Sequence, residues 1–298
     1  PRNVGSYFGY IAQGQYLNGI VAAHATKSKK LGFVAAKPIP QVLNNINGFL
    51  LGARSVDPSI TCQVIFTGEW SLAVKEAEAT NALIDGGADV ITCHVDSPKV
   101  TVETAARRGA YVCGYHADQS ALAKDRYLTG AEWDWAPIYK GFVADMQAGK
   151  APPNFVRGGL PDGFVKMSPY GPAVSEEARR NADAVKAEMM KGGFAIIKGP
   201  LKDNKGNAIA EAGKGFAENA PELESTGYLV EGVKGFTPAL LTEPTPGPGS
   251  VGGGIANAIL GSLVLTLIGI VIATPVGVMA GTYLAEYGRN SKLADVIR

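Results

Sequence analysis

Aromatic, histidine and carboxylate side chains gather in short segments that each follow an apolar run of the sequence. Two of the three histidines and all three tryptophans fall in these segments, which are 37–40, 67–70, 94–97, 115–119 and 133–135. Aromatic rings can stack on a flat ligand, while carboxylates and amides can hydrogen-bond its polar edge. These residue types therefore predict a binding face for a flat ligand with a polar edge.

The same segments contain no arrangement that is typical of an enzyme. His94 and Asp96 could be considered as an acid–base pair, but no nucleophile can be assigned as their partner. No GxGxxG motif follows the first predicted strand, and the GxxxxGK(S/T), GxSxG and HExxH motifs are missing from the sequence. The sequence thus predicts no catalytic residue, no metal site and no cofactor, and it favours a binding protein.

The elements that would position these residues alternate along the chain. Short apolar runs predict strands at 31–36, 61–66, 89–93 and 110–114, and helical periodicity predicts helices at 42–54, 72–83 and 100–108. This alternation predicts an α/β fold with a parallel sheet and helices on both of its faces. Ligands bind beyond the carboxyl ends of such strands, which is where the polar segments lie.

Beyond residue 128 the pattern is less regular. We expect helices at 132–148 and 176–191, and short strands at 155–157 and 163–167.

Charge and cysteine content exclude two classes of protein. Lys and Arg number 28 against 27 Asp and Glu, and this balance argues against a nucleic-acid partner. The three cysteines are an odd number, and each lies in or beside an apolar run. We therefore expect buried free thiols in place of a disulfide framework.

Hydropathy is concentrated near the carboxyl terminus. No charged residue occurs from Pro244 to Ala285, and the apolar run at 255–283 exceeds the ~20 residues that cross a bilayer. The basic residues that follow this run predict a cytoplasmic carboxyl terminus, with the rest of the chain outside an inner or plasma membrane. A buried core helix is the alternative. The domains expected are 1–236, a Pro/Gly-rich linker at 237–251, and a membrane segment at 252–298.

Residues 3–236 resemble the basic membrane protein (BMP) or PnrA-like family of ABC-transporter solute-binding proteins. The resemblance is carried by Lys-Leu-Gly-Phe-Val-Ala-Ala at 30–36, Asn-Gly-Phe-Leu-Leu-Gly-Ala-Arg at 47–54, Leu-Ile-Asp-Gly-Gly-Ala-Asp-Val-Ile at 83–91, and shorter stretches at 3–9, 16–22, 38–40, 114–118 and 228–232.

This resemblance implies a type I periplasmic-binding fold, in which two α/β lobes close on a purine nucleoside or base. It also implies ABC permease subunits as partners and, through them, an ATPase. The residues that fall in the corresponding cleft segments are Trp70, His94, Asp96, Tyr115, Asp118 and Trp135. Relatives begin with further elements, and residues 7–26 look like the last helix of the first lobe. We therefore expect the first lobe to be incomplete.

Residues 240–298 resemble PstA-type permease subunits of phosphate ABC importers. The matching stretches include Thr-Pro-Val-Gly at 274–277 and Tyr-Leu-Ala-Glu-Tyr-Gly-Arg-Asn at 283–290. Such permeases carry several more spans, and one span cannot form a pore.

Four functions remain open. Solute capture for an ABC importer, with a purine nucleoside or base as ligand, is favoured. The alternatives are a part of a phosphate permease, with phosphate as the less favoured ligand, a non-functional or artificial fusion, and an α/β nucleoside-processing enzyme.

Overall fold

The structure is a computed structural model that describes residues 4–217, 220–235 and 256–286. The chain divides into two units, Pro1–Gly235 and Phe236–Arg298. The strands of the described chain all belong to the first of these units, and the second contains the helix α8 (Ala256–Glu286).

A seven-stranded sheet forms the centre of the first unit, in the order β13-β3-β2-β4-β5-β6-β8. Neighbouring strands run parallel, except that β8 is antiparallel to β6. All five residues of β4, Val-Ile-Thr-Cys-His, are buried, as expected for a strand that has helices on both sides. The strands are β2 (Lys30–Ala35), β3 (Thr61–Phe66), β4 (Val90–His94), β5 (Tyr111–His116), β6 (Tyr127–Trp133), β8 (Val165–Met167) and β13 (Val233–Gly235).

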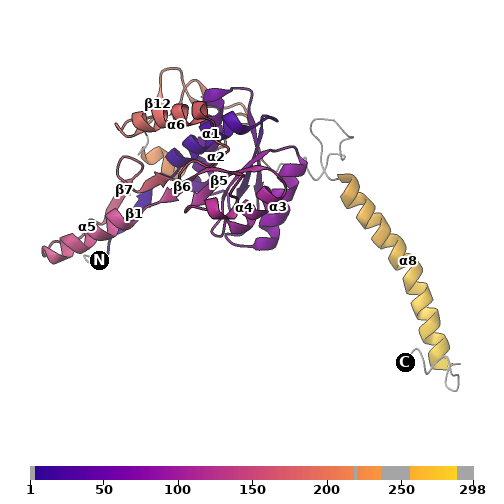
Figure 1. The fold of residues 1–298 in the computed structure, drawn as a ribbon. Coiled ribbons are helices and arrows are strands. Elements are labelled where there is room, and N and C mark those ends of the chain that lie inside the picture. The colour runs from indigo at the N-terminus through magenta and orange to yellow at the C-terminus, as the bar shows by residue number, and fades with distance from the viewer. Residues whose placement is uncertain (1–3, 218–219, 236–255, 287–298) are drawn as a thin grey trace. The chain divides into compact units, whose positions relative to one another are not determined.

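Helices cover both faces of this sheet (Figure 1). The helices α1 (Ala12–Ala25) and α2 (Pro40–Val56) cross on one face, where α6 (Glu176–Met189) packs against α1. The helices α3 (Ala73–Asp85) and α4 (Lys99–Arg107) pack together on the other face. The hydrophobic core fills the two layers between helices and sheet.

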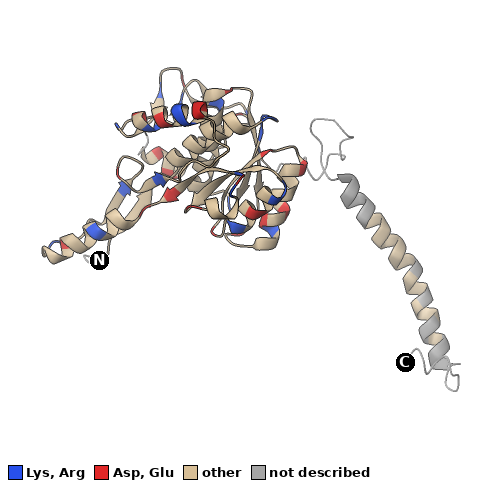
Figure 2. Ribbon diagram, viewed as in Figure 1, with Lys and Arg blue, Asp and Glu red and all other residues tan. Residues whose placement is uncertain are grey.

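Local sequence explains how these helices begin. Pro40 occupies the first turn of α2, where its missing N–H costs no hydrogen bond. The Ser175 hydroxyl accepts a hydrogen bond from the Ala178 N–H at 3.1 Å and so caps α6. Acidic and basic residues alternate along the exposed side of α6, so no field of one sign develops there (Figure 2).

The remaining described strands form three small sheets. The strands β1 (Ser6–Gly9) and β7 (Phe155–Gly158) pair in parallel, β10 (Leu201–Lys202) pairs with β11 (Ala208–Ala210), and β9 (Ile197–Lys198) pairs with β12 (Gly215–Phe216). Two short 3-10 helices, η1 (Ser120–Leu122) and η2 (Pro221–Ser225), complete the first unit together with α5 (Ala136–Gln147).

The strands and helices predicted between residues 31 and 116 are confirmed to within two residues at each end. The same holds for β7, β8 and α6. These segments are either apolar throughout or clearly amphipathic, so the sequence pattern and the final environment agree.

The helix predicted at 132–148 is wrong at its start. Residues 127–133 form β6, and α5 begins only at Ala136. Glu132 interrupts the apolar pattern of this strand, yet the side chain is buried. It accepts a hydrogen bond from the Ser168 hydroxyl at 2.6 Å and pairs with Lys166 at 3.5 Å. Both partners come from or next to β8, so the pairing that explains a buried glutamate lies more than thirty residues away.

The interpretation of residues 7–26 as the last helix of a separate first lobe is also wrong. Residues 6–9 are the strand β1, and α1 covers β6 and β8 of the seven-stranded sheet. The interpretation came from the order of elements in relatives, which does not show which sheet a helix covers.

The second unit contains α8, a helix of 31 residues with Pro275 inside it. In the ranges that the structure describes, no helix combines the length and the hydropathy needed to cross a membrane. The membrane span predicted at 252–298 is thus not supported by the structure. The linker predicted at 237–251 lies outside the described residues.

The crossing of α1 and α2 depends on glycine. A Cβ atom at Gly52 would lie 1.9 Å from the carbonyl oxygen of Tyr16, and one at Gly19 would lie 2.0 Å from that of Phe49. Real Cβ atoms do not approach backbone so closely, so the two helices would have to separate to accept even an alanine.

We expect the substitution Gly52→Ala to lower the free energy of unfolding by about 1–3 kcal/mol, because it overpacks a backbone contact. The control is Gly141→Ala in α5, where a Cβ would meet nothing within 4 Å. That change should raise stability by about 0.4–1 kcal/mol, because alanine restricts the unfolded chain. Urea unfolding of the full chain measures both. Equal effects at the two positions would contradict the account of the crossing.

Candidate functional site

The carboxyl ends of β3, β4 and β5 bring aromatic rings together. The ring of Trp70, in the loop after β3, lies 6.2 Å from that of His94, the last residue of β4. The His94 ring is 4.5 Å from Tyr115, which in turn is 4.0 Å from His116 at the end of β5. Three of the segments singled out by the sequence, 67–70, 94–97 and 115–119, therefore meet at the carboxyl ends of these strands.

Two tryptophans extend this cluster. Trp133, at the end of β6, stacks on Trp135 with ring centres 4.5 Å apart and planes 19° apart. The Trp133 indole Nε1–H donates a hydrogen bond to His116 Nδ1 at 3.1 Å. A ring of Tyr7 in β1 also lies 4.9 Å from Trp135. We call Trp70, His94, Tyr115, His116, Trp133 and Trp135 the edge cluster.

A buried hydrogen-bond network underlies the edge cluster. His94 is 4% exposed, Tyr115 is 1% exposed and Asn45 of α2 is fully buried. Asn45 Nδ2 donates to His94 Nδ1 at 2.8 Å and to the Tyr115 hydroxyl at 3.4 Å. The neutral His94 tautomer that completes this network carries its proton on Nε2 and donates it to the same hydroxyl at 3.0 Å.

Both histidines of the edge cluster favour the neutral form. Burial, together with the nearby His116 ring, lowers the pKa of His94 to about 3. Burial also lowers the pKa of His116, although the Asp96 carboxylate acts in the opposite direction. At neutral pH neither ring therefore brings a positive charge to this part of the molecule, which suits an uncharged ligand.

The two predicted carboxylates differ in their surroundings. Asp96 is exposed, and its backbone N–H donates to the Trp70 carbonyl oxygen at 2.7 Å, which holds the tryptophan loop against β4. Asp118 is exposed in the turn after β5, where its carboxylate accepts a hydrogen bond from the Ser120 N–H at 2.8 Å. The edge cluster thus joins Trp70, His94, Tyr115 and Trp135, with Asp96 beside Trp70. A ligand contact for any of the six predicted residues stays a prediction.

Three residues of this region were not among the predicted site residues. His116 and Trp133 lie in or beside the polar segments, and His116 also has a left-handed backbone with φ of 76°. That conformation is uncommon for a residue other than glycine and is concentrated at functional sites. Asn45 gave no signal, because it lies inside a helical pattern and reaches His94 only through the fold.

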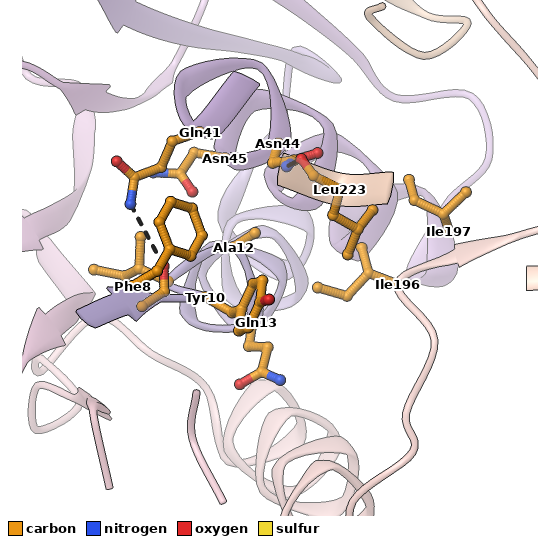
Figure 3. Close-up of a pocket in the computed structure, with 12 residues that line it drawn as sticks. Phe8, Tyr10, Ala12, Gln13, Gln41, Asn44, Asn45, Ile196, Ile197 and Leu223 are labelled. Atoms are coloured by element: carbon orange, nitrogen blue, oxygen red, sulfur yellow. Dashed lines mark hydrogen bonds between the residues drawn. The ribbon is translucent and has the colours of Figure 1, made fainter. Parts of the chain in front are cut away.

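A pocket opens next to this network (Figure 3). It lies between the β1–α1 junction, the first turns of α2, residues 196–197 and η2. Asn45 belongs to both the pocket and the network. Gly9 belongs to the pocket and abuts Trp133, since a Cβ there would lie 2.2 Å from the indole ring.

Other reactive groups of the first unit are held in the core. Cys62, Cys93 and Cys113 are buried free thiols, as predicted, and burial raises the pKa of all three. Within the described ranges, no group of three or more His, Cys, Asp or Glu side chains is arranged to hold a metal ion.

Comparison with known families shows which proteins this chain is related to. The ABC-transporter substrate-binding protein PnrA-like family matches residues 2–199. The chain belongs to this family. Its members are substrate-binding proteins of ABC transporters, so the resemblance seen in the sequence is confirmed at the level of the family.

Two curated relatives of this PnrA-like chain match most of its length. A purine-binding protein of Brucella abortus is 32% identical over 212 residues, which are 71% of this chain and 60% of that protein. A putative ABC-transporter glucose-binding protein of Haloferax volcanii is 31% identical over 240 residues, which are 80% and 58% of the two chains. The chain thus spans about three-fifths of the length of these relatives.

Solved structures agree with the fold. An ABC-transporter solute-binding protein from Conexibacter woesei has a TM-score of 0.52 and 25% identity, covering 64% of each chain. A transcriptional activator of the comK gene from Bacillus halodurans has a TM-score of 0.56 and 25% identity, covering 62% of this chain and 64% of the other. The predicted α/β fold, like that of periplasmic binding proteins and with a parallel sheet, is confirmed.

The second resemblance covers a much shorter piece. The phosphate transport permease PstA of Yersinia pestis is 57% identical over 70 residues, which are 24% of each chain. That this piece and the PnrA-like part form one working protein stays a prediction.

The neutral histidines predict how stability depends on pH. Unfolded histidine takes up a proton near pH 6.5, whereas folded His94 stays neutral until about pH 3. The contribution of neutral His94 to the free energy of unfolding is therefore fully present above pH ~6.5. It is lost as the pH falls, by up to about 1.4 kcal/mol per pH unit.

We expect His94→Gln to be less stable than the unmodified chain at pH 7 and to lose less stability between pH 6 and pH 4. Urea unfolding across this range measures both slopes, and the carboxylates that the two proteins share cancel in the comparison. If the free energies of unfolding of the two proteins changed with pH in parallel, that would contradict a buried neutral His94.

Proposed function

We propose that the chain captures an uncharged purine nucleoside or base and delivers it to an ABC importer. The observation that carries this proposal is the edge cluster, in which aromatic and neutral histidine rings from the carboxyl ends of β3, β4, β5 and β6 meet at one side of the sheet. A purine offers a large flat face for stacking, and its ribose offers hydroxyls to nearby carboxylates.

The proposed roles follow from exposure. Trp70 is half-buried and Asp96 is exposed, so we assign stacking to the indole and ribose hydroxyl binding to the carboxylate. His94 and Tyr115 are almost fully buried, so we assign them to support of the rings above them. Trp135 would fix Trp133 by stacking, and Asp118 would order the turn beside the site.

The relatives support a ring-shaped uncharged ligand, but they differ in its class. One is a purine-binding protein and another a putative glucose-binding protein. Indole rings and carboxylates also suit a sugar, so glucose is the second candidate. Phosphate is less favoured, because neutral histidines supply no positive charge for an anion.

The partners and the location of the chain belong to the same proposal. We infer that its receptor part works outside the membrane with permease subunits and, through them, an ATPase, as a substrate-binding protein and without catalysis. The PstA-like sequence would anchor it in the inner or plasma membrane, with the carboxyl terminus in the cytoplasm. Retention of the full chain in membranes washed with alkaline carbonate supports an anchor. Release into the wash would contradict it.

We expect calorimetric titration of the full chain to show saturable binding of adenosine, and Trp70→Ala to weaken it about tenfold to a hundredfold. Base stacking on an aromatic ring is worth about 1–3 kcal/mol. Trp70→Phe should lose less, because it keeps a ring. The control is Tyr111→Ala, since Tyr111 begins β5 and lies at the opposite end of the strand.

Tighter binding of glucose than of adenosine would indicate that the ligand is a sugar and not a purine. Binding of phosphate alone would favour the permease alternative, and conversion of adenosine to products would revive the enzyme. No binding of adenosine, guanosine or adenine at millimolar concentration would overturn the proposal and favour a non-functional fusion.

A further inference from the structure

The pocket beside the edge cluster is mainly apolar and contains amide side chains along one wall. Phe8, Tyr10, Ile196 and Leu223 supply apolar surface, while Gln41, Asn44 and Asn45 project from the first turns of α2 (Figure 3). Such a mixture suits a ligand that is flat, mostly apolar and marked by a few polar atoms.

The amide groups of this wall are not equivalent. Gln41 Nε2 donates to the Gly9 carbonyl oxygen at 3.4 Å. Asn44 donates to the Leu223 carbonyl oxygen and accepts from the Thr226 hydroxyl at 2.8 Å. Asn45 Oδ1, in contrast, is buried and has no hydrogen-bond partner among the described residues. Buried oxygens are seldom left without a donor, so this atom points to a partner that comes from outside the chain.

The hydrogen-bond network determines which side-chain atom of Asn45 has no partner. In the observed orientation its nitrogen uses both hydrogens, on His94 Nδ1 and on the Tyr115 hydroxyl. If the amide were rotated by 180°, its oxygen would accept from His94 Nδ1–H, and the Tyr115 hydroxyl would have to donate to His94 Nε2. The amide oxygen and the hydroxyl oxygen would then face each other with no proton between them, so one hydrogen bond would be lost. The oxygen is therefore the atom of this amide that is left without a partner.

We propose that Asn45 Oδ1 accepts a hydrogen bond from an N–H of the purine base, and that this contact makes the site specific for bases with such a donor. The inference rests on the proposed function and adds a specificity-determining residue to it. The base would occupy the pocket beside Gly9, and its sugar would extend toward Trp70 and Asp96. Adenosine offers an exocyclic amino group, and inosine offers a ring N–H.

Purine riboside tests the contact, because it has the size of adenosine but lacks the amino group. We expect the full chain to bind adenosine about tenfold to a hundredfold more tightly than purine riboside, since the analogue leaves the buried oxygen unpaired. In Asn45→Ser the preference should disappear. In the matched control Asn44→Ala the preference should remain, because the oxygen of Asn44 already has a donor.

A second variant keeps the test decisive if Asn45→Ser does not fold. Ile196→Trp fills the pocket, leaves every residue of the His94 network unsubstituted and should abolish adenosine binding, with the fold checked by circular dichroism. Equal affinity for adenosine and purine riboside in the unmodified chain would overturn the inference and leave the proposed function standing. So would unchanged binding in a folded Ile196→Trp. No purine binding at all would overturn both.

Discussion

The desolvation of His94 is the constraint on which this edge of the molecule depends. A histidine buried at the end of a central strand cannot carry a charge, so each of its nitrogens needs a matched neutral partner. Asn45 supplies a donor for one nitrogen, and the Tyr115 hydroxyl accepts from the other. These hydrogen bonds tie α2 to β4 and β5, three elements that the chain reaches at widely separated positions.

The rings above this network take their positions from it. His94 contacts Trp70, Tyr115 contacts His116, and His116 accepts the indole hydrogen bond of Trp133. Asn45 lies on α2, whose backbone touches that of α1 at the glycines of the crossing. The packing of two helices, the protonation state of one histidine and the shape of a binding face are thus parts of one arrangement.

Much of the fold could be predicted from the sequence, because strands buried on both sides must be apolar and their helices amphipathic. The strands at 30–35 and 90–94 are examples. The same rule failed at β6, where Glu132 is buried with partners that only the folded chain supplies. For the site, the sequence identified the segments that carry rings, since parallel strands bring their carboxyl ends together. It could not identify Asn45, whose importance depends on which neighbours leave its oxygen without a donor.

All three tryptophans of the chain, Trp70, Trp133 and Trp135, belong to the edge cluster, so ligand binding there must alter their emission. The most direct test is the intrinsic tryptophan fluorescence of the full chain during titration with adenosine. A saturable change in intensity or emission maximum is expected. Calorimetric binding of adenosine with unchanged tryptophan emission would place the ligand elsewhere and contradict binding at the edge cluster.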